Sequence, residues 1–177
     1  GSGHNPAMVN LFLDKLLPIP GMLRAAIGAG KVYQKTGLQA LVRGTGVLKL
    51  LKMADMEALM PVAEGPAYIP SGQVVEAVGE QRATVALLAG CVMGAAYGDT
   101  DRATARVLAA NGCRVVTPAG QGCCGALHSH RGELDGARAL AKANIDAFEA
   151  AGVDAIIANA AGCGATMKHY AELFKDD

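Results

Sequence analysis

The stretch ATVALLAG, residues 83–90, is a short apolar run that ends in glycine, and it opens an alternation of strand and helix patterns. A helix pattern with an acidic start and a glycine stop follows over residues 101–112, and a second strand pattern, RVVTP, over residues 114–118. The series is completed by a helix, a strand and a last helix at residues 133–152, 154–159 and 165–174. Short connections between alternating strands and helices predict an α/β fold: a βαβαβα three-layer domain with a parallel sheet of three or four strands.

The composition divides the chain into three parts. Residues 1–60 carry apolar residues at helical spacing with basic residues between them, which predicts a short helical connector; residues 1–4 have the composition of a tag remnant. Residues 61–82 contain three prolines and several glycines without a sustained period, which is typical of a linker or an extended arm. The α/β pattern occupies residues 83–177.

The overall charge and the cysteine count limit the class of protein. The 16 basic and 16 acidic residues balance, so the charge does not indicate nucleic-acid binding, and we expect none. No apolar run reaches the roughly 20 residues that a membrane span needs. Five cysteines in a core-rich chain of 177 residues do not form a disulfide scaffold. We therefore expect free or metal-bound thiols in a reducing, cytoplasmic compartment.

Four of the five cysteines follow the three predicted strands. Cys91 follows the first strand, Cys123 and Cys124 follow the second, and Cys163 follows the third. Because the carboxyl ends of parallel strands meet at one edge of a sheet, where ligands bind, the sequence predicts that these thiols gather there. Cys113 lies between a helix and a strand, at the opposite edge, and is most simply a small buried hydrophobe.

The surroundings of these thiols favour a polynuclear metal centre. Small residues let the backbone approach a bulky inorganic group and leave N–H groups free to donate to sulfur. The flanking glycines are Gly90, Gly122, Gly125, Gly162 and Gly164. Adjacent cysteines form too short a chelate for one tetrahedral ion, whereas each can bind a different iron of a cluster, and paired zinc ligands use wider spacing. A zinc site, a thiol redox site and simple packing remain alternatives. His128 is a candidate for a hydrogen bond to the centre or for an ordinary loop residue.

The cysteine motifs resemble a known family. The motifs are GCVM (90–93), GCCGALHSH (122–130) and GCGAT (162–166), with 31 residues between Cys91 and Cys123 and 38 between Cys124 and Cys163. This pattern resembles the CCG cysteine-rich domain of heterodisulfide reductase B subunits, lactate-utilisation iron–sulfur proteins and glycolate oxidase (glycolate dehydrogenase) iron–sulfur subunits, the last being most similar. The resemblance covers residues 83–177, and the helical stretch before it is similar to the connector of that glycolate oxidase component.

The resemblance implies an electron-transfer subunit of an oxidoreductase complex. In such complexes, flavin-containing subunits oxidise glycolate to glyoxylate, and iron–sulfur centres pass electrons towards quinone. The implied metal ligands are Cys91, Cys123, Cys124 and Cys163, with His128 tuning the centre. The implied cofactor is a [4Fe–4S] cluster, of the non-cubane type in the heterodisulfide reductase relatives. The resemblance also implies peripheral association of the full complex with the inner face of a membrane.

Two departures from the family pattern affect this interpretation. Thr166 stands where the fullest pattern has a fifth cysteine. An ordinary four-cysteine cluster, a hydroxyl or water as fifth ligand, and the absence of a stable cluster from this fragment all remain open. The chain also lacks the ferredoxin-type module and the second CCG unit, so we do not expect it to oxidise glycolate alone. Two other functions compete: a thiol–disulfide redox domain that uses the Cys123–Cys124 pair, and a metal-free module for subunit interaction.

Overall fold

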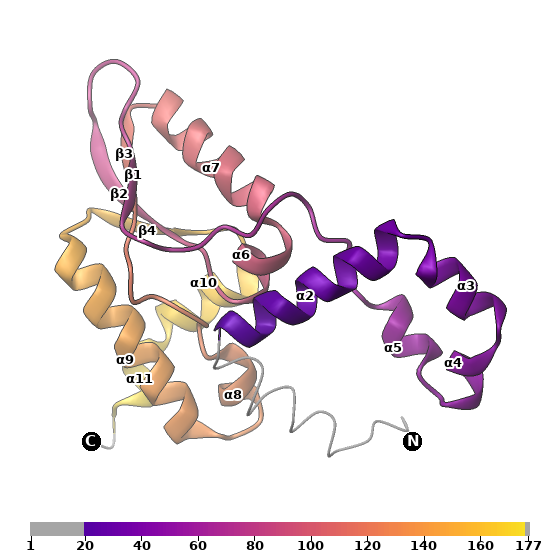
Figure 1. The fold of residues 1–177 in the computed structure, drawn as a ribbon. Helices are drawn as coiled ribbons and strands as arrows, with labels where there is room; N and C mark the ends of the chain where they lie inside the picture. Colours follow the sequence, from indigo (N-terminus) through magenta and orange to yellow (C-terminus); the bar gives the residue numbers. More distant parts are fainter. Residues whose placement is uncertain (1–19, 176–177) are drawn as a thin grey trace.

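A four-stranded sheet forms the centre of the molecule in the computed structural model, which describes residues 20–175; the expectation for residues 1–4 lies outside this range. The strand order is β1-β3-β2-β4, and β2 pairs in parallel with both β3 and β4 (Figure 1). The strands are β1 (Gln73–Val75), β2 (Ala83–Leu88), β3 (Cys113–Thr117) and β4 (Ala155–Ala158). The predicted α/β class with a mostly parallel sheet and a preceding helical segment is confirmed.

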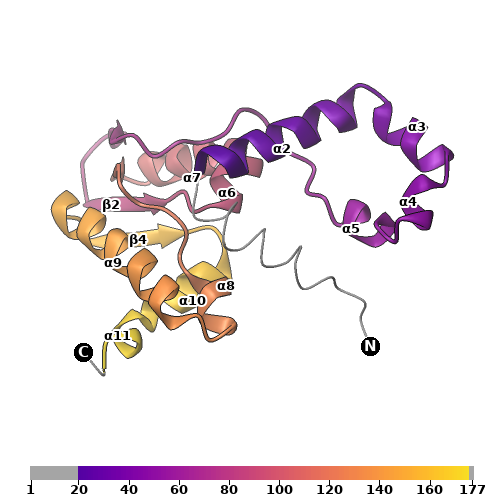
Figure 2. The same ribbon diagram turned by 60° about the horizontal axis from the view of Figure 1, so that its bottom comes forward.

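Helices cover both faces of the sheet. Successive side chains of β2 point to opposite faces, so each face of the strand has an apolar surface for a helix to pack on. Val85 and Leu87 pack into a cluster with Ala105 of α7, whereas Ala86 and Leu88 pack with Phe148 of α9. Figure 2 shows α7 on one side of β2 and β4, and α9 and α10 on the other. The helices of this domain are α6 (Val92–Ala96), α7 (Gly98–Ala110), α8 (Ala126–His130), α9 (Leu134–Ala151), α10 (Ala161–Lys168) and α11 (Tyr170–Leu173).

The strand β1 lies inside the stretch that the sequence marks as a linker or arm, and it pairs antiparallel with β3. Only residues 76–82 connect it to β2. A parallel connection within a sheet needs a crossover of about a dozen residues or more, so this short connection is compatible with an antiparallel edge strand and not with a further parallel one.

The helix after β4 begins earlier than its sequence pattern indicates. The pattern predicts a helix over residues 165–174, but α10 already starts at Ala161, and α11 follows after His169. Cys163 therefore lies in the first turn of a helix and not in the preceding loop. The turn-forming glycines on either side of Cys163 concealed this helix start in the sequence.

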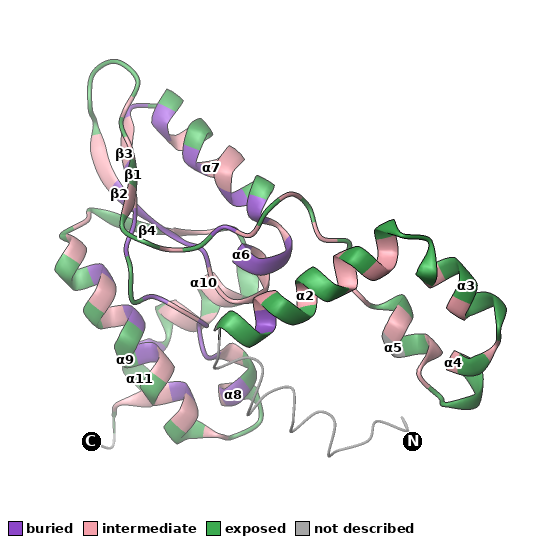
Figure 3. Cartoon of the chain, in the orientation of Figure 1, coloured by how far each residue is buried: buried purple, intermediate pink, exposed green. Residues whose placement is uncertain are grey.

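The N-terminal helices form an arm, which consists of α2 (Pro20–Lys35), α3 (Leu38–Gly44), α4 (Val47–Leu50) and α5 (Ala54–Ala58). Leu23 of α2 is buried against Ala95 of α6, whereas α3, α4 and α5 extend away from the sheet (Figures 1 and 2) and are largely exposed (Figure 3). Arg43 pairs with Glu57 at 2.9 Å and links α3 to α5. None of the helices within residues 20–175 combines the length and apolarity needed to cross a bilayer.

Candidate metal centre

Three connections at the carboxyl edge of the parallel strands bring four thiols together. Cys91 caps the start of α6 after β2, Cys123 and Cys124 precede α8 after β3, and Cys163 lies in the first turn of α10 after β4. The sulfur atoms of Cys124 and Cys163 are 3.1 Å apart. Cys123 lies within hydrogen-bonding reach of both Cys91 and Cys124. The topology thus gathers the thiols that the sequence singled out.

All four cysteines line one apolar cavity of about 340 Å³. Its other lining residues are Leu88, Ala89, Gly90, Val92, Met93, Ala126, Leu127, Ala158, Asn159, Ala160 and Gly162. Cys123 and Cys124 are buried, and Cys91 and Cys163 are half-buried. Soft sulfur donors in an apolar enclosure are the surroundings that thiolate-bound iron–sulfur centres require, so the donor type and number fit such a group.

The donors do not form a site for a single metal ion. In the part of the chain that the structure describes, no group of three or more His, Cys, Asp or Glu side chains could hold one ion. Close sulfur contacts join Cys91 to Cys123, Cys123 to Cys124, and Cys124 to Cys163 in series. A mononuclear zinc site needs four ligands around one point, and this arrangement does not offer it.

The predicted flanking glycines differ in what their positions require. Gly90 has a φ of +66° and Gly125 a φ of +80°, in the left-handed region that favours glycine, and a Cβ on Gly125 would also lie 3.3 Å from the carbonyl oxygen of Ala137. Gly90 and Gly162 line the thiol cavity, and Gly122 lines a neighbouring one. A Cβ on Gly164 would make only an ordinary contact.

A buried asparagine, Asn144, holds the backbone of the adjacent cysteines. Its Oδ1 accepts a hydrogen bond from the N–H of Gly122 at 2.9 Å, and its Nδ2 donates to the carbonyl oxygen of Cys123 at 2.9 Å. Nδ2 also lies 3.1 Å from the hydroxyl of Tyr170, which donates to the carbonyl oxygen of Cys124 at 2.9 Å. Helices α9 and α11 therefore position this loop.

Sequence reasoning did not assign Asn144 or Tyr170 to the site, although a signal for Asn144 was present. Ala137, Ala141, Asn144 and Phe148 form the buried stripe of α9, and Asn144 is its only polar member. A buried amide needs hydrogen-bond partners. An asparagine at a core position of an otherwise apolar helix stripe therefore indicates that backbone N–H or C=O groups nearby need a hydrogen-bond partner.

A second buried amide, Gln121, ties the loop to the end of β2. Its Oε1 accepts from the N–H of Ala89 at 2.8 Å, and its Nε2 donates to the carbonyl oxygen of Leu87 at 3.0 Å. The side chain of Gln121 thus forms hydrogen bonds with backbone groups that lie beyond the end of the pairing between β2 and β3. It sets the distance between the segment that leads to Cys91 and the segment that carries Cys123.

The pKa values of the four thiols are shifted in opposite directions. Hydrogen bonds from Cys123 and Cys163, followed by the N–H of Ala126, lower the pKa of Cys124 to about 3. The same contacts raise the pKa of Cys123 and of Cys163, because each must keep its proton to donate it. A hydrogen bond from Cys123 lowers the pKa of Cys91. Cys124 is therefore the thiolate of the metal-free group at neutral pH.

Two further residues considered in the sequence lie apart from the cavity. His128 is buried, its Nδ1 has no hydrogen-bond partner among residues 20–175, and it packs over Gly136 of α9; it lines neither the thiol cavity nor the neighbouring one. The hydroxyl of Thr166 donates to the carbonyl oxygen of Gly162 at 2.9 Å, one turn back in its own helix. This bond engages the hydroxyl proton of Thr166 within its own helix.

Replacing Asn144 by alanine should destabilise the protein, because it leaves the N–H of Gly122 and the carbonyl oxygen of Cys123 buried without partners. We expect a loss of about 3 kcal/mol in the free energy of unfolding, measured by urea denaturation. Asn111→Ala is the matched control: Asn111 is exposed and bonds only the backbone of its own helix, so its loss should stay below about 1 kcal/mol. Equal losses in the two variants would contradict the positioning role.

The metal-free, reduced protein should hold one thiolate at unusually low pH. A pKa of about 3 lies below that of an unfolded cysteine, about 8.5, so the folded state keeps Cys124 ionised as the pH falls between these values. The ultraviolet absorption of one thiolate should persist in the folded protein from about pH 8 to about pH 5, and at about pH 5 it should disappear in urea, because unfolded cysteines are then protonated. Cys124→Ala should abolish it and Cys113→Ala should not; a signal that fades already near pH 8 would refute the assignment.

Comparisons with known proteins agree with the geometry. Residues 85–168 match the model of the CCG cysteine-rich domain, and residues 4–60 match that of the "Glycolate oxidase iron-sulfur subunit, linker region". The chain is 40% identical over 172 residues to the "Probable glycolate oxidase iron-sulfur subunit" of Bacillus subtilis, covering 92% of this chain and 37% of the relative. It is 40% identical over 96 residues to the "Glycolate oxidase iron-sulfur subunit" of Escherichia coli, covering 52% of this chain and 24% of the relative.

The matched part of the chain spans 37% of the length of the first relative and 24% of the second, so both relatives are much longer than this chain. No solved structure matches. The two matches together cover most of the chain and leave residues 61–84, which contain β1, between them. The chain is thus similar to glycolate oxidase iron–sulfur subunits in its linker region, and residues 85–168 match the CCG cysteine-rich domain.

Proposed function

We propose that this chain is an electron-transfer segment of a glycolate oxidase complex, and that Cys91, Cys123, Cys124 and Cys163 ligate a [4Fe–4S] cluster. The observation that supports this proposal is the gathering of the four sulfurs in one apolar cavity from three separate strand ends. The names of the relatives give the complex, a glycolate oxidase. In this proposal other subunits oxidise glycolate to glyoxylate, and electrons pass through this segment towards quinone.

The residues of the chain would support a cluster in three ways. When bound, the cluster supplies one-electron chemistry. Cys124 is already a thiolate in the metal-free state, and so offers a ligand without first losing a proton. The N–H of Gly125 lies 3.5 Å from the sulfur of Cys123 and can stabilise negative charge there. Asn144 and Gln121 hold the loop by hydrogen bonds, and the cavity is lined mostly by apolar residues; both features would influence the redox potential of such a centre.

The partners belong to the same proposal. They are the flavin-containing subunits, together with the ferredoxin-type module and the second CCG unit that this chain lacks, in a cytoplasmic complex that associates peripherally with the inner face of the membrane. The arm offers a surface for such contacts, because Leu41, Leu50 and Leu59 are 66%, 81% and 81% exposed. By itself this chain should not oxidise glycolate.

Anaerobic reconstitution with iron and sulfide tests the ligands directly. We expect about four irons and four sulfides per chain, visible absorption, and an electron-spin-resonance signal after reduction. Serine at any of the four positions should lower the iron content or change the signal. Cys113→Ser is the matched control and should leave both unchanged, because Cys113 lies at the start of β3, away from the cavity. Iron contents that do not distinguish Cys113→Ser from Cys124→Ser would refute the ligand set.

A thiol–disulfide function is the second candidate, and one contact favours it. The 3.1 Å approach of Cys124 to Cys163 places a thiolate beside a thiol. Oxidation would join these two sulfurs and release two electrons and the remaining proton to an added disulfide oxidant. A colourless protein in which this pair, and not Cys123 with Cys124, forms a reversible disulfide would favour this function over the cluster.

A further inference from the structure

A second cavity adjoins the thiol group. It has a volume of about 390 Å³ and shares Gly90, Cys91 and Cys123 with the thiol cavity. We propose that this second cavity binds a small organic monoanion, a carboxylate with a short apolar body, through Arg24 of α2. The proposal goes beyond electron transfer and does not depend on iron, because it concerns a side chain and a cavity that exist in the metal-free protein.

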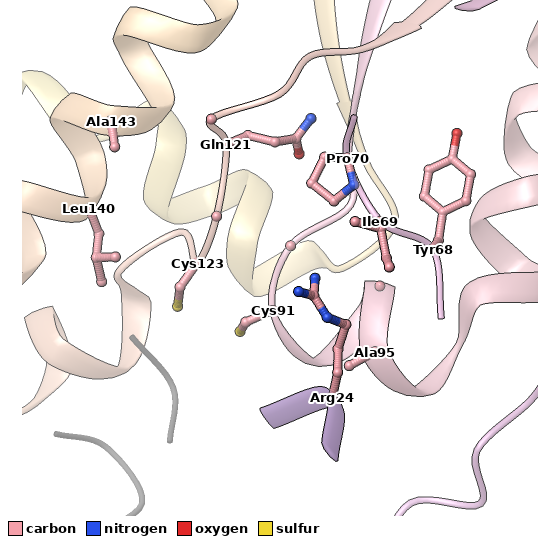
Figure 4. A pocket seen from close by; sticks show the side chains of 14 residues that line it. Arg24, Tyr68, Ile69, Pro70, Cys91, Ala95, Gln121, Cys123, Leu140 and Ala143 are labelled. Atoms are coloured by element: carbon pink, nitrogen blue, oxygen red, sulfur yellow. The ribbon is translucent and has the colours of Figure 1, made fainter. Parts of the chain in front are cut away.

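The packing of α2 on α6 brings Arg24 to the cavity. Leu23, the preceding residue, is 3% exposed and packs against Ala95, with Cys91 at the edge of the same cluster. This anchor fixes the start of α2 beside the thiols. In Figure 4 the side chain of Arg24 rises from α2 into the space between Cys91 and Ile69. A residue of the N-terminal arm therefore completes a cavity of the α/β domain.

Among the described residues, Arg24 is the only one with a permanent charge that lines this cavity, and it has no compensating partner. Within residues 20–175 it takes part in none of the ion pairs or hydrogen bonds. The other polar side chains at the cavity are engaged: the hydroxyl of Tyr68 bonds Thr117 at 2.9 Å, and the amide of Gln121 bonds the backbone near β2. Removing a guanidinium partly from water without an anion beside it costs free energy. A carboxylate can accept two parallel hydrogen bonds from the N–H groups of a guanidinium.

The size and walls of the cavity define the rest of the ligand. A volume of about 390 Å³ is within the usual range for a small-molecule site. Apart from Arg24, the thiols and the engaged side chains of Tyr68 and Gln121, the lining side chains are apolar: Ile69, Pro70, Ala95, Leu140 and Ala143. Cys91 lines the same cavity as Arg24 and is half-buried, whereas Cys123 is only 5% exposed, so Cys91 is the thiol that can report on an occupant.

Competing alkylating reagents test this assignment in the metal-free, reduced, full chain. Iodoacetate carries a carboxylate and iodoacetamide does not, and both transfer a carbon to sulfur with loss of iodide. We expect the ratio of their rates at Cys91, followed by peptide mass spectrometry, to fall about fivefold in Arg24→Gln, the change that losing a partly exposed ion pair produces. Arg24→Lys should keep part of the preference.

Two controls separate a site from a general effect of charge. Arg106→Gln removes the same charge from an exposed position of α7 and should leave the ratio at Cys91 unchanged, and Cys113 should show no dependence on Arg24. Propionate should slow the labelling of Cys91 by iodoacetamide in the unmodified protein and not in Arg24→Gln. If Arg24→Gln does not fold, the propionate experiment on the unmodified protein decides alone. An unchanged ratio in Arg24→Gln, an equal fall in Arg106→Gln, or no protection by propionate would overturn the proposal.

Discussion

Hydrogen bonds from two buried amides to the loop between β3 and α8 are the constraint on which the site depends. This loop is rich in glycine, so it has little side-chain surface with which to anchor itself, and its backbone groups are buried near the sheet. Buried backbone N–H and C=O groups require partners. Gln121 bonds the residues after β2, and Asn144 bonds Gly122 and Cys123 from α9. Without these bonds the two adjacent thiols would have no defined position relative to Cys91 and Cys163.

The thiol group combines close sulfur contacts with an apolar enclosure. In a medium of low polarity, one negative charge is stabilised by nearby S–H donors, while a second charge is disfavoured. The pKa of Cys124 is lowered and the pKa values of Cys123 and Cys163 are raised for this one reason. A polynuclear centre would replace these protons with iron and let all four sulfurs become thiolates. The metal-free group therefore holds the donors close together while carrying little charge.

The arm and the α/β domain meet at a small contact with consequences for the site. Leu23 buries itself against α6, the helix that begins after Cys91, so the linker region is attached at the thiol edge of the sheet. The remainder of the arm contributes little to the domain and leaves large apolar side chains exposed. Among the described residues, α2 is the helix of the arm that packs at the thiol edge of the sheet.

The sequence by itself determined the three parallel strands, the helices α7 and α9 that cover them, and the edge at which the cysteines meet. These follow from local patterns, because apolar runs that end in glycine set the strands and parallel strands end at a common edge. The tertiary structure alone decided the antiparallel pairing of β1, the position of Cys163 inside α10, and the contacts of Gln121, Asn144, Tyr170 and Arg24 with the site. The contacts at the site join residues 20 or more positions apart in the chain, whose proximity is a result of packing and leaves no short-range pattern in the sequence.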